Sequence, residues 1–264
     1  MTAPFPTQKQ EDWRYADLDA LKPVWEQFGE PPTITVGPGE TLEEVWLPTQ
    51  DDVQLRRKHI AIEAGASARI FMLNAAPVYG RIELEITLAE GAEFELFGAN
   101  IGTGLSTNEI VTNVKHAAPN GRSLQVVRSV LGGRATGSFI GKIEVAHGAQ
   151  KTDAEQSVKA MLLDRGATAN AKPELEIFAD DVKCAHGASV GELDPMQLFY
   201  AESRGLDPPG ARALLLEGFI TGLWDSAQQP DAISEAAHEA LRRVSSSPVR
   251  GGGPSAAERM VEGA

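Results

Sequence analysis

The sequence predicts a mainly β protein whose strands stack as parallel coils and whose C-terminal part is helical. Between Thr33 and Leu193, short segments alternate apolar and polar residues with the period of two that half-buried strands show. A Gly-Ala pair recurs between these segments at spacings that suit one or two coils of a solenoid. The chain then divides into an N-terminal helical and irregular segment (1–32), a core of stacked coils (33–193), a helical domain (194–246) and a mobile tail (247–264).

The N-terminal segment carries one short amphipathic helix. Leu18, Leu21, Trp25 and Phe28 follow each other at intervals of three or four residues, so they form one apolar stripe. Such a stripe favours packing on the main body of the protein over a free docking arm.

Twelve short segments of the core are predicted strands. No gap between them holds a convincing long helix, which excludes a fold built from β-α-β units. The predicted strands are residues 34–36, 53–55, 60–62, 69–73, 82–88, 93–97, 109–111, 124–127, 138–140, 142–145, 159–163 and 175–177.

Glycine marks the predicted corners between strands, because it tolerates the positive φ of a tight corner. Hairpin signals are absent between adjacent strands except at Asn120-Gly121, which favours parallel coils over a meander. A β-sandwich stays the alternative, since a period of two is common to both folds. The corner glycines are Gly65, Gly91, Gly148, Gly166 and Gly187.

Three helices are predicted after Leu193. Asp194 and Asp207 are N-cap residues, and each precedes a proline at the first helical position. Gly205 ends the first helix, and Pro230 separates the second from the third. The predicted apolar faces are Met196, Phe199 and Tyr200 in the first helix, Ala211, Leu214, Leu215, Phe219 and Leu223 in the second, and Ile233, Ala237, Leu241 and Val244 in the third.

Composition narrows the function classes. The net charge of −13 disfavours nucleic acid and anionic membranes, since binding to either depends on Lys and Arg. No apolar run approaches the roughly 18 residues that span a bilayer, and the N-terminus lacks a secretory signal. The single cysteine fits a reducing cytoplasm and excludes a four-thiolate cluster site within the chain. We therefore expect a cytoplasmic protein that contacts a metal only with other ligand types or with a partner.

Cys184 and His186 are the candidate metal ligands. Side chains at i and i+2 of a strand point to the same face, so the thiolate and the imidazole can bind one metal ion or receive a sulfur atom. The spacing alone is a weak signal, because a lone cysteine is more often a small buried apolar group. Asp180-Asp181 is interpreted as a solvated pair. The chain contains no Gly-x-x-x-x-Gly-Lys-Ser/Thr phosphate loop, so we do not expect it to hydrolyse ATP.

Four parts of the chain resemble one known family. They are Glu11–Tyr15; Phe139–Val145 with Ala149–Gln156; Pro173–Ile177 leading into Asp180–Ala188; and Leu198–Tyr200, Ser203–Gly205 and Ala211–Phe219. Together they resemble the SufD branch of the SufB/SufD family of iron–sulfur cluster assembly proteins. The likeness is most specific over residues 116–223, and the N-terminal side is shorter than in many members.

The resemblance implies a right-handed parallel β-helix with a helical C-terminal domain, and a non-catalytic scaffold subunit rather than an enzyme. It implies pairing with SufB through the last coils and docking of the ATPase SufC on the terminal helices. His186 matches a histidine implicated in building the nascent cluster at the SufB interface, and Cys184 matches a less certain neighbour. The residues implied for SufC docking are Leu198, Phe199, Tyr200, Arg204, Leu214, Leu215 and Phe219.

The cofactors that the resemblance implies belong to the complex. A transient iron–sulfur cluster is shared with SufB, reduced flavin is associated with the complex, and ATP is bound by SufC and not by this chain. ATP-driven dimerisation of SufC is implied to strain the helices and open the SufB–SufD interface. Whether the isolated protein is a homodimer stays open.

Two other function classes are compatible with the residues alone. Parallel β-helices also host carbohydrate lyases and hydrolases, which need clustered carboxylates in a groove. Glu83, Glu85, Glu93 and Glu95 form a candidate ladder, although such alternation is typical of the wet face of a strand. The third class is a homodimeric binding module without chemistry.

Overall fold

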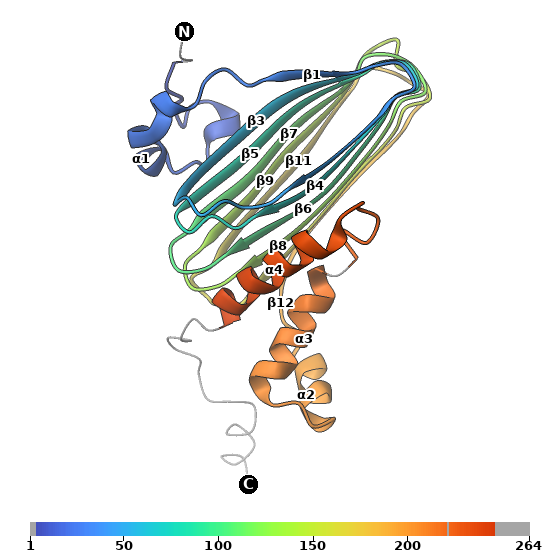
Figure 1. Ribbon diagram of the computed structural model, residues 1–264. Coiled ribbons are helices and arrows are strands. Elements are labelled where there is room, and N and C mark those ends of the chain that lie inside the picture. The colour runs from blue at the N-terminus through green and yellow to red at the C-terminus, as the bar shows by residue number, and fades with distance from the viewer. Residues whose placement is uncertain (1–3, 221, 246–264) are drawn as a thin grey trace.

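The computed structural model describes residues 4–220 and 222–245 and shows a parallel β-solenoid with helices at one side (Figure 1). Two six-stranded sheets face each other, with strand orders β1-β3-β5-β7-β9-β11 and β12-β10-β8-β6-β4-β2. Consecutive strands therefore alternate between the sheets, and every pairing is parallel. The prediction of parallel coils is confirmed, and the sandwich alternative is wrong. The predicted mobile tail, 247–264, lies outside the described residues.

Nine of the twelve strands have ten residues and pair over their whole length, so equivalent positions of successive coils stand in columns. Sheet A consists of β1 (Thr33–Val36), β3 (Val53–Ile62), β5 (Tyr79–Leu88), β7 (Thr107–His116), β9 (Thr136–Val145) and β11 (Thr168–Ile177). Sheet B consists of β2 (Thr41–Trp46), β4 (Ser67–Asn74), β6 (Glu93–Gly102), β8 (Arg122–Leu131), β10 (Asp153–Leu162) and β12 (Lys183–Glu192).

The strand predictions differ from the structure in two ways. The segments 53–55 and 60–62 belong to the single strand β3, because the charged residues between them continue the strand on its pleated faces. The same holds for 138–140 and 142–145 in β9. β2 and β12 have no counterpart among the predicted strands, since both lie at an end of the solenoid and carry few buried apolar residues.

The core fills the space between the two sheets. Every second residue of a strand points inward, as in β5, where Ile82, Leu84, Ile86 and Leu88 are buried. Each such side chain contributes roughly 1.5–3 kcal/mol by leaving water. Stacked coils repeat this arrangement, so the alternation in the sequence becomes a continuous apolar interior.

The corner glycines are only partly as predicted. Gly65 and Gly91 adopt φ of 65° and 63°, the left-handed region that favours glycine. Gly148 lies in the turn after β9, where Lys151 supplies the left-handed residue instead, with φ of 62°. The prediction that Gly187 is a corner is wrong, because it lies within β12 opposite Ser157. A Gly-Ala pair is small enough to lie in a corner or within a strand, so the recurring pair does not distinguish a corner from a strand.

The N-terminal segment packs on the outer face of sheet A. It contains η1 (Glu11–Trp13), α1 (Leu18–Leu21) and η2 (Lys22–Gln27). The predicted apolar stripe contributes Leu21 and Trp25 to a cluster with Leu55 of β3 and Tyr79 of β5. Packing on the main body, the favoured interpretation of the stripe, is what the structure shows.

Three helices follow the solenoid, as the capping signals predict: α2 (Pro195–Ser203), α3 (Pro208–Ile220) and α4 (Pro230–Ser245). The Asp194 carboxylate accepts a hydrogen bond from the Met196 N–H at 2.8 Å, and the Asp207 carboxylate accepts one from the Gly210 N–H at 3.1 Å. Helix α4 lies across the outer face of sheet B, whereas α2 and α3 project away from the solenoid (Figure 1). None of the described helices has the length and apolar character needed to cross a membrane.

The buried face of α4 is as predicted, but that of α3 is not. In α4, Ile233 and Leu241 are buried against sheet B. In α3 the buried residues are Ala211, Leu216 and Ile220, and Leu214 is 53% exposed. Leucine occupies three successive positions of α3, so the sequence pattern does not identify which side packs inward.

Candidate functional site

The N-terminal end of the solenoid is closed by a charged pair. Glu44 of β2 and Lys58 of β3 occupy register positions opposite Ile70 and Leu84, whose side chains point inward. The Lys58 ammonium lies 2.6 Å from a Glu44 carboxylate oxygen and 5.1 Å from the centroid of the Trp46 ring. The Trp46 indole N–H donates to the same carboxylate at 2.6 Å. These groups satisfy one another and cover the apolar interior at this end.

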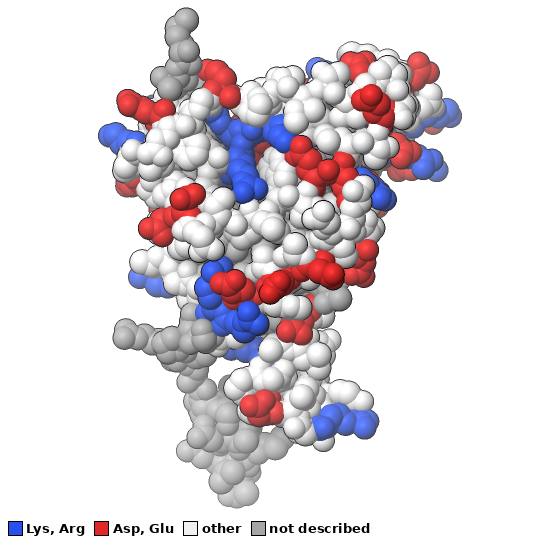
Figure 2. All heavy atoms as spheres, in the orientation of Figure 1, with Lys and Arg blue, Asp and Glu red and all other residues white. Residues whose placement is uncertain are grey.

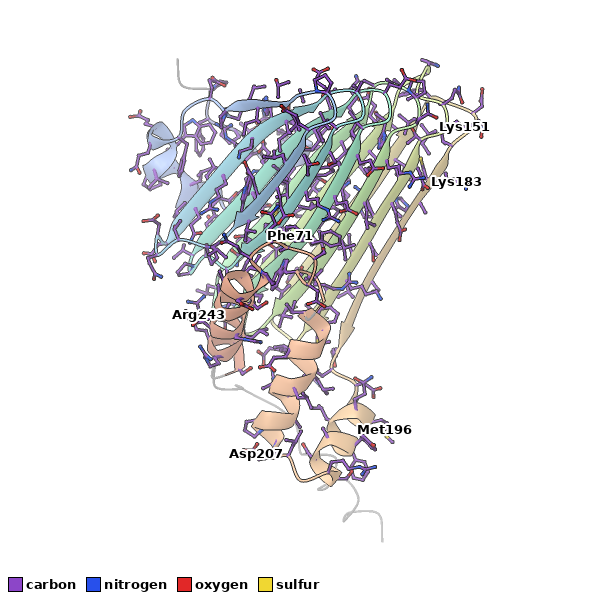
Figure 3. The ribbon with its side chains drawn as sticks, turned by 45° about the vertical axis from the view of Figure 1, so that its right-hand side comes forward. Phe71, Lys151, Lys183, Met196, Asp207 and Arg243 are labelled. Atoms are coloured by element: carbon purple, nitrogen blue, oxygen red, sulfur yellow. The ribbon has the colours of Figure 1, made fainter. Side chains whose placement is uncertain are left out.

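The C-terminal end of the solenoid is open. β11 and β12 are the last strands of their sheets, and in the described part of the chain each has a strand partner on one side only. Nearly all of β12 is exposed, including Val190 at 50%, and Ile177 at the end of β11 and Phe178 directly after it are exposed as well. A full-length edge strand with apolar exposure is a template for pairing with another chain. Figure 3 shows Lys183 on this outermost strand.

Cys184 and His186 lie on β12 at this open end, on the face that continues the solenoid interior. Their register partners on β10 are Ala154 and Gln156, which are both buried. Cys184 is half-buried and packs against the core, whereas His186 is exposed. Burial raises the pKa of the Cys184 thiol, and the Asp153 carboxylate raises it further. The structure therefore brings both predicted ligands to one face.

The chemistry available to this chain alone is limited. Within the described residues, no group of three or more His, Cys, Asp and Glu side chains is placed to hold a metal ion. Asp180 and Asp181 are exposed, and Asp181 forms an ion pair with Lys151, which agrees with the interpretation of a solvated pair. A metal ion bound by Cys184 and His186 would therefore need further ligands from outside the described residues.

Sequence reasoning missed a column of polar side chains in the interior behind His186. Gln125 of β8, Gln156 of β10 and His186 of β12 are successive register partners. Both glutamine side chains are buried, and Thr112 of β7 donates a hydrogen bond to the Gln125 carbonyl at 2.7 Å. The signal that could have found these glutamines is a polar residue at a position of the strand where the alternation predicts an inward-facing apolar side chain.

The α2–α3 projection carries an exposed apolar surface. Figure 2 shows mostly uncharged atoms over its described part, and Figure 3 places Met196 on the outer side of α2. Of the residues implied for docking, Phe199, Tyr200, Arg204 and Leu214 are exposed, while Leu198, Leu215 and Phe219 are partly buried against the protein. Met196 at 70% and Leu206 at 39% exposed extend this surface.

The carboxylate ladder of the enzyme alternative does not form. Glu83 and Glu85 belong to β5 of sheet A, and Glu93 and Glu95 belong to β6 of sheet B, so the four do not line one groove. Three of them are paired with cations or histidine. Glu83 pairs with Arg81, Glu85 with His59 and Glu95 with Arg69.

Comparison with known proteins identifies relatives. A family model described as the SufBD core domain of the SUF system for FeS cluster assembly matches residues 42–219. An iron–sulfur cluster assembly SufBD family protein of Synechocystis is 33% identical over 173 residues, which is 63% of this chain and 38% of that protein. SufD of Escherichia coli is 29% identical over 209 residues, or 74% and 47%. SufD of Bacillus subtilis is 35% identical over 120 residues, or 46% and 28%. The chain spans less than half the length of these relatives.

Proposed function

Since the chain belongs to the SufB/SufD family of iron–sulfur cluster assembly proteins, we propose that it is a SufD-like scaffold subunit of a SufBCD-type complex. In this role it has no catalytic activity of its own. It presents one wall of the interface at which the nascent cluster is built, and it couples that interface to an ATPase.

The observation that carries the proposal is the difference between the two ends of the solenoid. At the N-terminal end the edge strands β1 and β2 are short and the Glu44–Lys58 pair lies over the interior, but the C-terminal end exposes two edge strands of ten residues each. A SufB-like subunit that adds its own last strands to β11 and β12 would pair their free backbone groups and cover the exposed apolar side chains. Cys184 and His186 would then lie at the seam between the subunits.

The nascent cluster is the cargo of this seam. Because Cys184 and His186 supply half of a site, the SufB-like subunit provides the other ligands for iron or accepts the sulfur. His186 is the stronger candidate of the two, since it is exposed and Cys184 is half-buried with a raised thiol pKa. We assign ATP to the SufC-like subunit and any reduced flavin to the assembled complex.

A SufC-like ATPase docks on the exposed apolar surface of α2 and α3, centred on Phe199, Tyr200 and Leu214. The opposite side of α3 is anchored in the core through Leu216 and Ile220, which share a cluster with Phe71 of sheet B. A rigid helix that contacts the motor on one side and the solenoid on the other transmits displacement to the sheets. Nucleotide-driven movement of the ATPase would thereby pull on the seam.

Anaerobic co-expression with SufB-like and SufC-like chains tests this function. With an affinity tag on this chain, we expect the other two chains to be purified with it as one complex that carries iron and acid-labile sulfide. Native mass spectrometry gives the subunit composition, and metal and sulfide analysis gives the cargo. Purification of this chain alone from cells that express all three chains would refute the proposal.

A homodimer is the second candidate state of the isolated protein. The same free edges of β11 and β12 that suit a SufB-like subunit are available to a second copy of this chain. Light scattering of the isolated protein, with and without a SufB-like chain, separates the two states. If the edges are shared, the SufB-like chain displaces the second copy.

A further inference from the structure

We propose that Gln156 is a positioning residue that fixes the orientation and tautomer of the His186 ring. The inference deepens the proposed function and rests on it, because it gives His186 a partner behind the seam. Gln156 and His186 are register partners on the neighbouring parallel strands β10 and β12, which are about 4.8 Å apart. Both side chains lie on the face toward the interior, so they stack directly on one another.

Gln156 is buried and has hydrogen-bonding capacity to spare. Its side chain is 1% exposed, and neither its amide nitrogen nor its carbonyl oxygen has a partner among the described residues. Buried polar groups in proteins are nearly always paired, so an unpaired carboxamide at this position indicates a partner. The register brings two polar side chains to it, Gln125 on the inner side and His186 on the side of the open end.

The Gln156 carboxamide reaches the opposite sheet. A Cβ atom at Gly141 of β9 would collide with the Phe139 ring and would lie 2.7 Å from the Gln156 amide nitrogen, which is closer than a real contact allows. Glycine at 141 therefore leaves space that the Phe139 ring and the carboxamide share.

The deeper part of the column is only partly hydrogen-bonded. The Thr112 hydroxyl donates to the Gln125 carbonyl oxygen at 2.7 Å, and the Gln125 amide nitrogen has no partner among the described residues. We assign the Gln156 carbonyl oxygen as the acceptor from a ring N–H of His186. The inner ring nitrogen then carries the proton, and the outer nitrogen presents a bare lone pair at the open end.

This arrangement suits a metal ligand. A histidine that binds a metal usually donates its other ring N–H to a carbonyl or carboxylate, which holds the tautomer and the ring orientation. Gln156 would do this for His186 before any iron arrives. The ring would otherwise rotate freely on the exposed strand.

The test uses the full chain with Gln156→Leu, an apolar replacement of similar size that should fold because it places no polar group at the buried position. Gln125→Leu is the matched control: it changes a buried glutamine of the same column one coil further from His186. The first readout is the ring 15N spectrum of the isolated, histidine-labelled protein, with the His186 signals assigned from a His186→Asn spectrum. The second is iron and sulfide in the anaerobic three-subunit complex.

We expect the His186 ring nitrogens of the unaltered protein to show a single tautomer. Gln156→Leu should convert it to a mixture, as in a free imidazole, and should lower bound iron about 10-fold. Gln125→Leu should leave the His186 signals unchanged. Unchanged His186 signals in Gln156→Leu, or equal changes in both variants, would overturn the inference and assign the column to buried water.

The two proposals fail separately. If His186→Ala leaves iron and sulfide unchanged, the cluster-building role of the seam is wrong. The ring spectrum of the isolated chain does not depend on iron, so it still decides whether Gln156 holds His186.

Discussion

The guanidinium carbon of Arg81 lies 3.7 Å from the centroid of the Trp13 ring, which fastens the N-terminal segment to the outer face of sheet A. Arg81 is fully buried, donates to the Asp12 carbonyl at 2.8 Å, and pairs with Glu83 and the buried Glu109. Burial raises the pKa of the Glu109 carboxyl, and the charge of Arg81 opposes that rise. One side chain thus joins two parts of the chain and supplies the counter-charge of a carboxylate buried between the N-terminal segment and sheet A.

Removing Arg81 should be severely destabilising. Arg81→Leu leaves Glu109 buried without a counter-charge, so we expect a loss of about 3–5 kcal/mol in the free energy of unfolding. Arg69→Leu is the control, because its pair with Glu95 is partly exposed and should contribute no more than about 1 kcal/mol. Urea unfolding followed by circular dichroism measures both. Equal losses would show that the buried cluster has no special role.

His116 should make stability depend on pH. His116 is buried at the end of β7, and one of its ring nitrogens lies 2.9 Å from the Ser123 hydroxyl. Burial lowers the pKa of its imidazole to about 4. Between pH 6.5 and about 4 the unfolded chain therefore binds a proton that the folded chain does not. Stability contributed by the neutral ring is complete above pH 6.5 and declines as the pH falls through this window, by up to about 3 kcal/mol.

The variant His116→Gln tests this assignment. Its free energy of unfolding should fall less between pH 7 and pH 5 than that of the unaltered protein. Unfolding at both pH values in urea gives the comparison. A pH dependence that is the same in the two proteins would place the titrating group elsewhere.

The free edge of β12 should be required for pairing with a SufB-like subunit. Val190→Glu places a charge on an edge residue that is 50% exposed, so folding should change by no more than about 0.5 kcal/mol. Burying that charge at an interface is costly, and we expect the Kd to rise at least 10-fold. Leu105→Glu is the control, since Leu105 is 73% exposed at a turn away from this edge. Titration calorimetry on both variants decides, and tight binding by Val190→Glu would place the seam elsewhere.

The docking surface for the ATPase should be separable from the fold. Phe199→Glu and Leu214→Glu change residues that are 64% and 53% exposed, so the variants should fold normally but no longer retain a SufC-like chain. Leu216→Glu changes a fully buried residue of the same helix and should unfold the helical domain instead. Co-purification together with thermal unfolding distinguishes these effects. Retention of the ATPase by both surface variants would contradict the assigned surface.

His186→Ala should leave folding and complex formation intact while lowering the iron and sulfide of the purified complex several-fold. The residue is exposed, so truncation creates no cavity. Ser189→Ala, on the same exposed strand, is the matched control. Metal and sulfide analysis of complexes purified without oxygen provides the measurement, and equal cluster content in the two variants would contradict the role.

Much of the fold was predictable because it depends on local patterns. Alternation in segments such as Ile82–Leu88 reports which residues face the interior, and Asp194 and Asp207 cap helices through atoms two or three residues away. The face of α3 was not predictable, because its burial depends on where Leu216 meets sheet B, far away in the sequence. Gly187 was misassigned for a similar reason: its place in β12 follows from pairing with β10.

The candidate site shows the same division. Cys184 and His186 could be chosen from residue type and spacing, since both properties are local. The glutamine column behind His186 could not, because Gln125 and Gln156 are 31 positions apart and meet only through strand register. The hydrogen bonds available to these glutamines depend on side chains from successive coils, which no short segment of the sequence contains.

The sequence by itself determined that this chain forms stacked strands followed by capped helices, because hydrophobic period and capping act between near neighbours. Only the tertiary structure decided that the Glu44–Lys58 pair lies over the interior at the end with the short strands β1 and β2, while the other end exposes the ten-residue strands β11 and β12. Parallel stacking brings together residues from successive coils, and a residue becomes buried or exposed according to whether another coil lies beyond it.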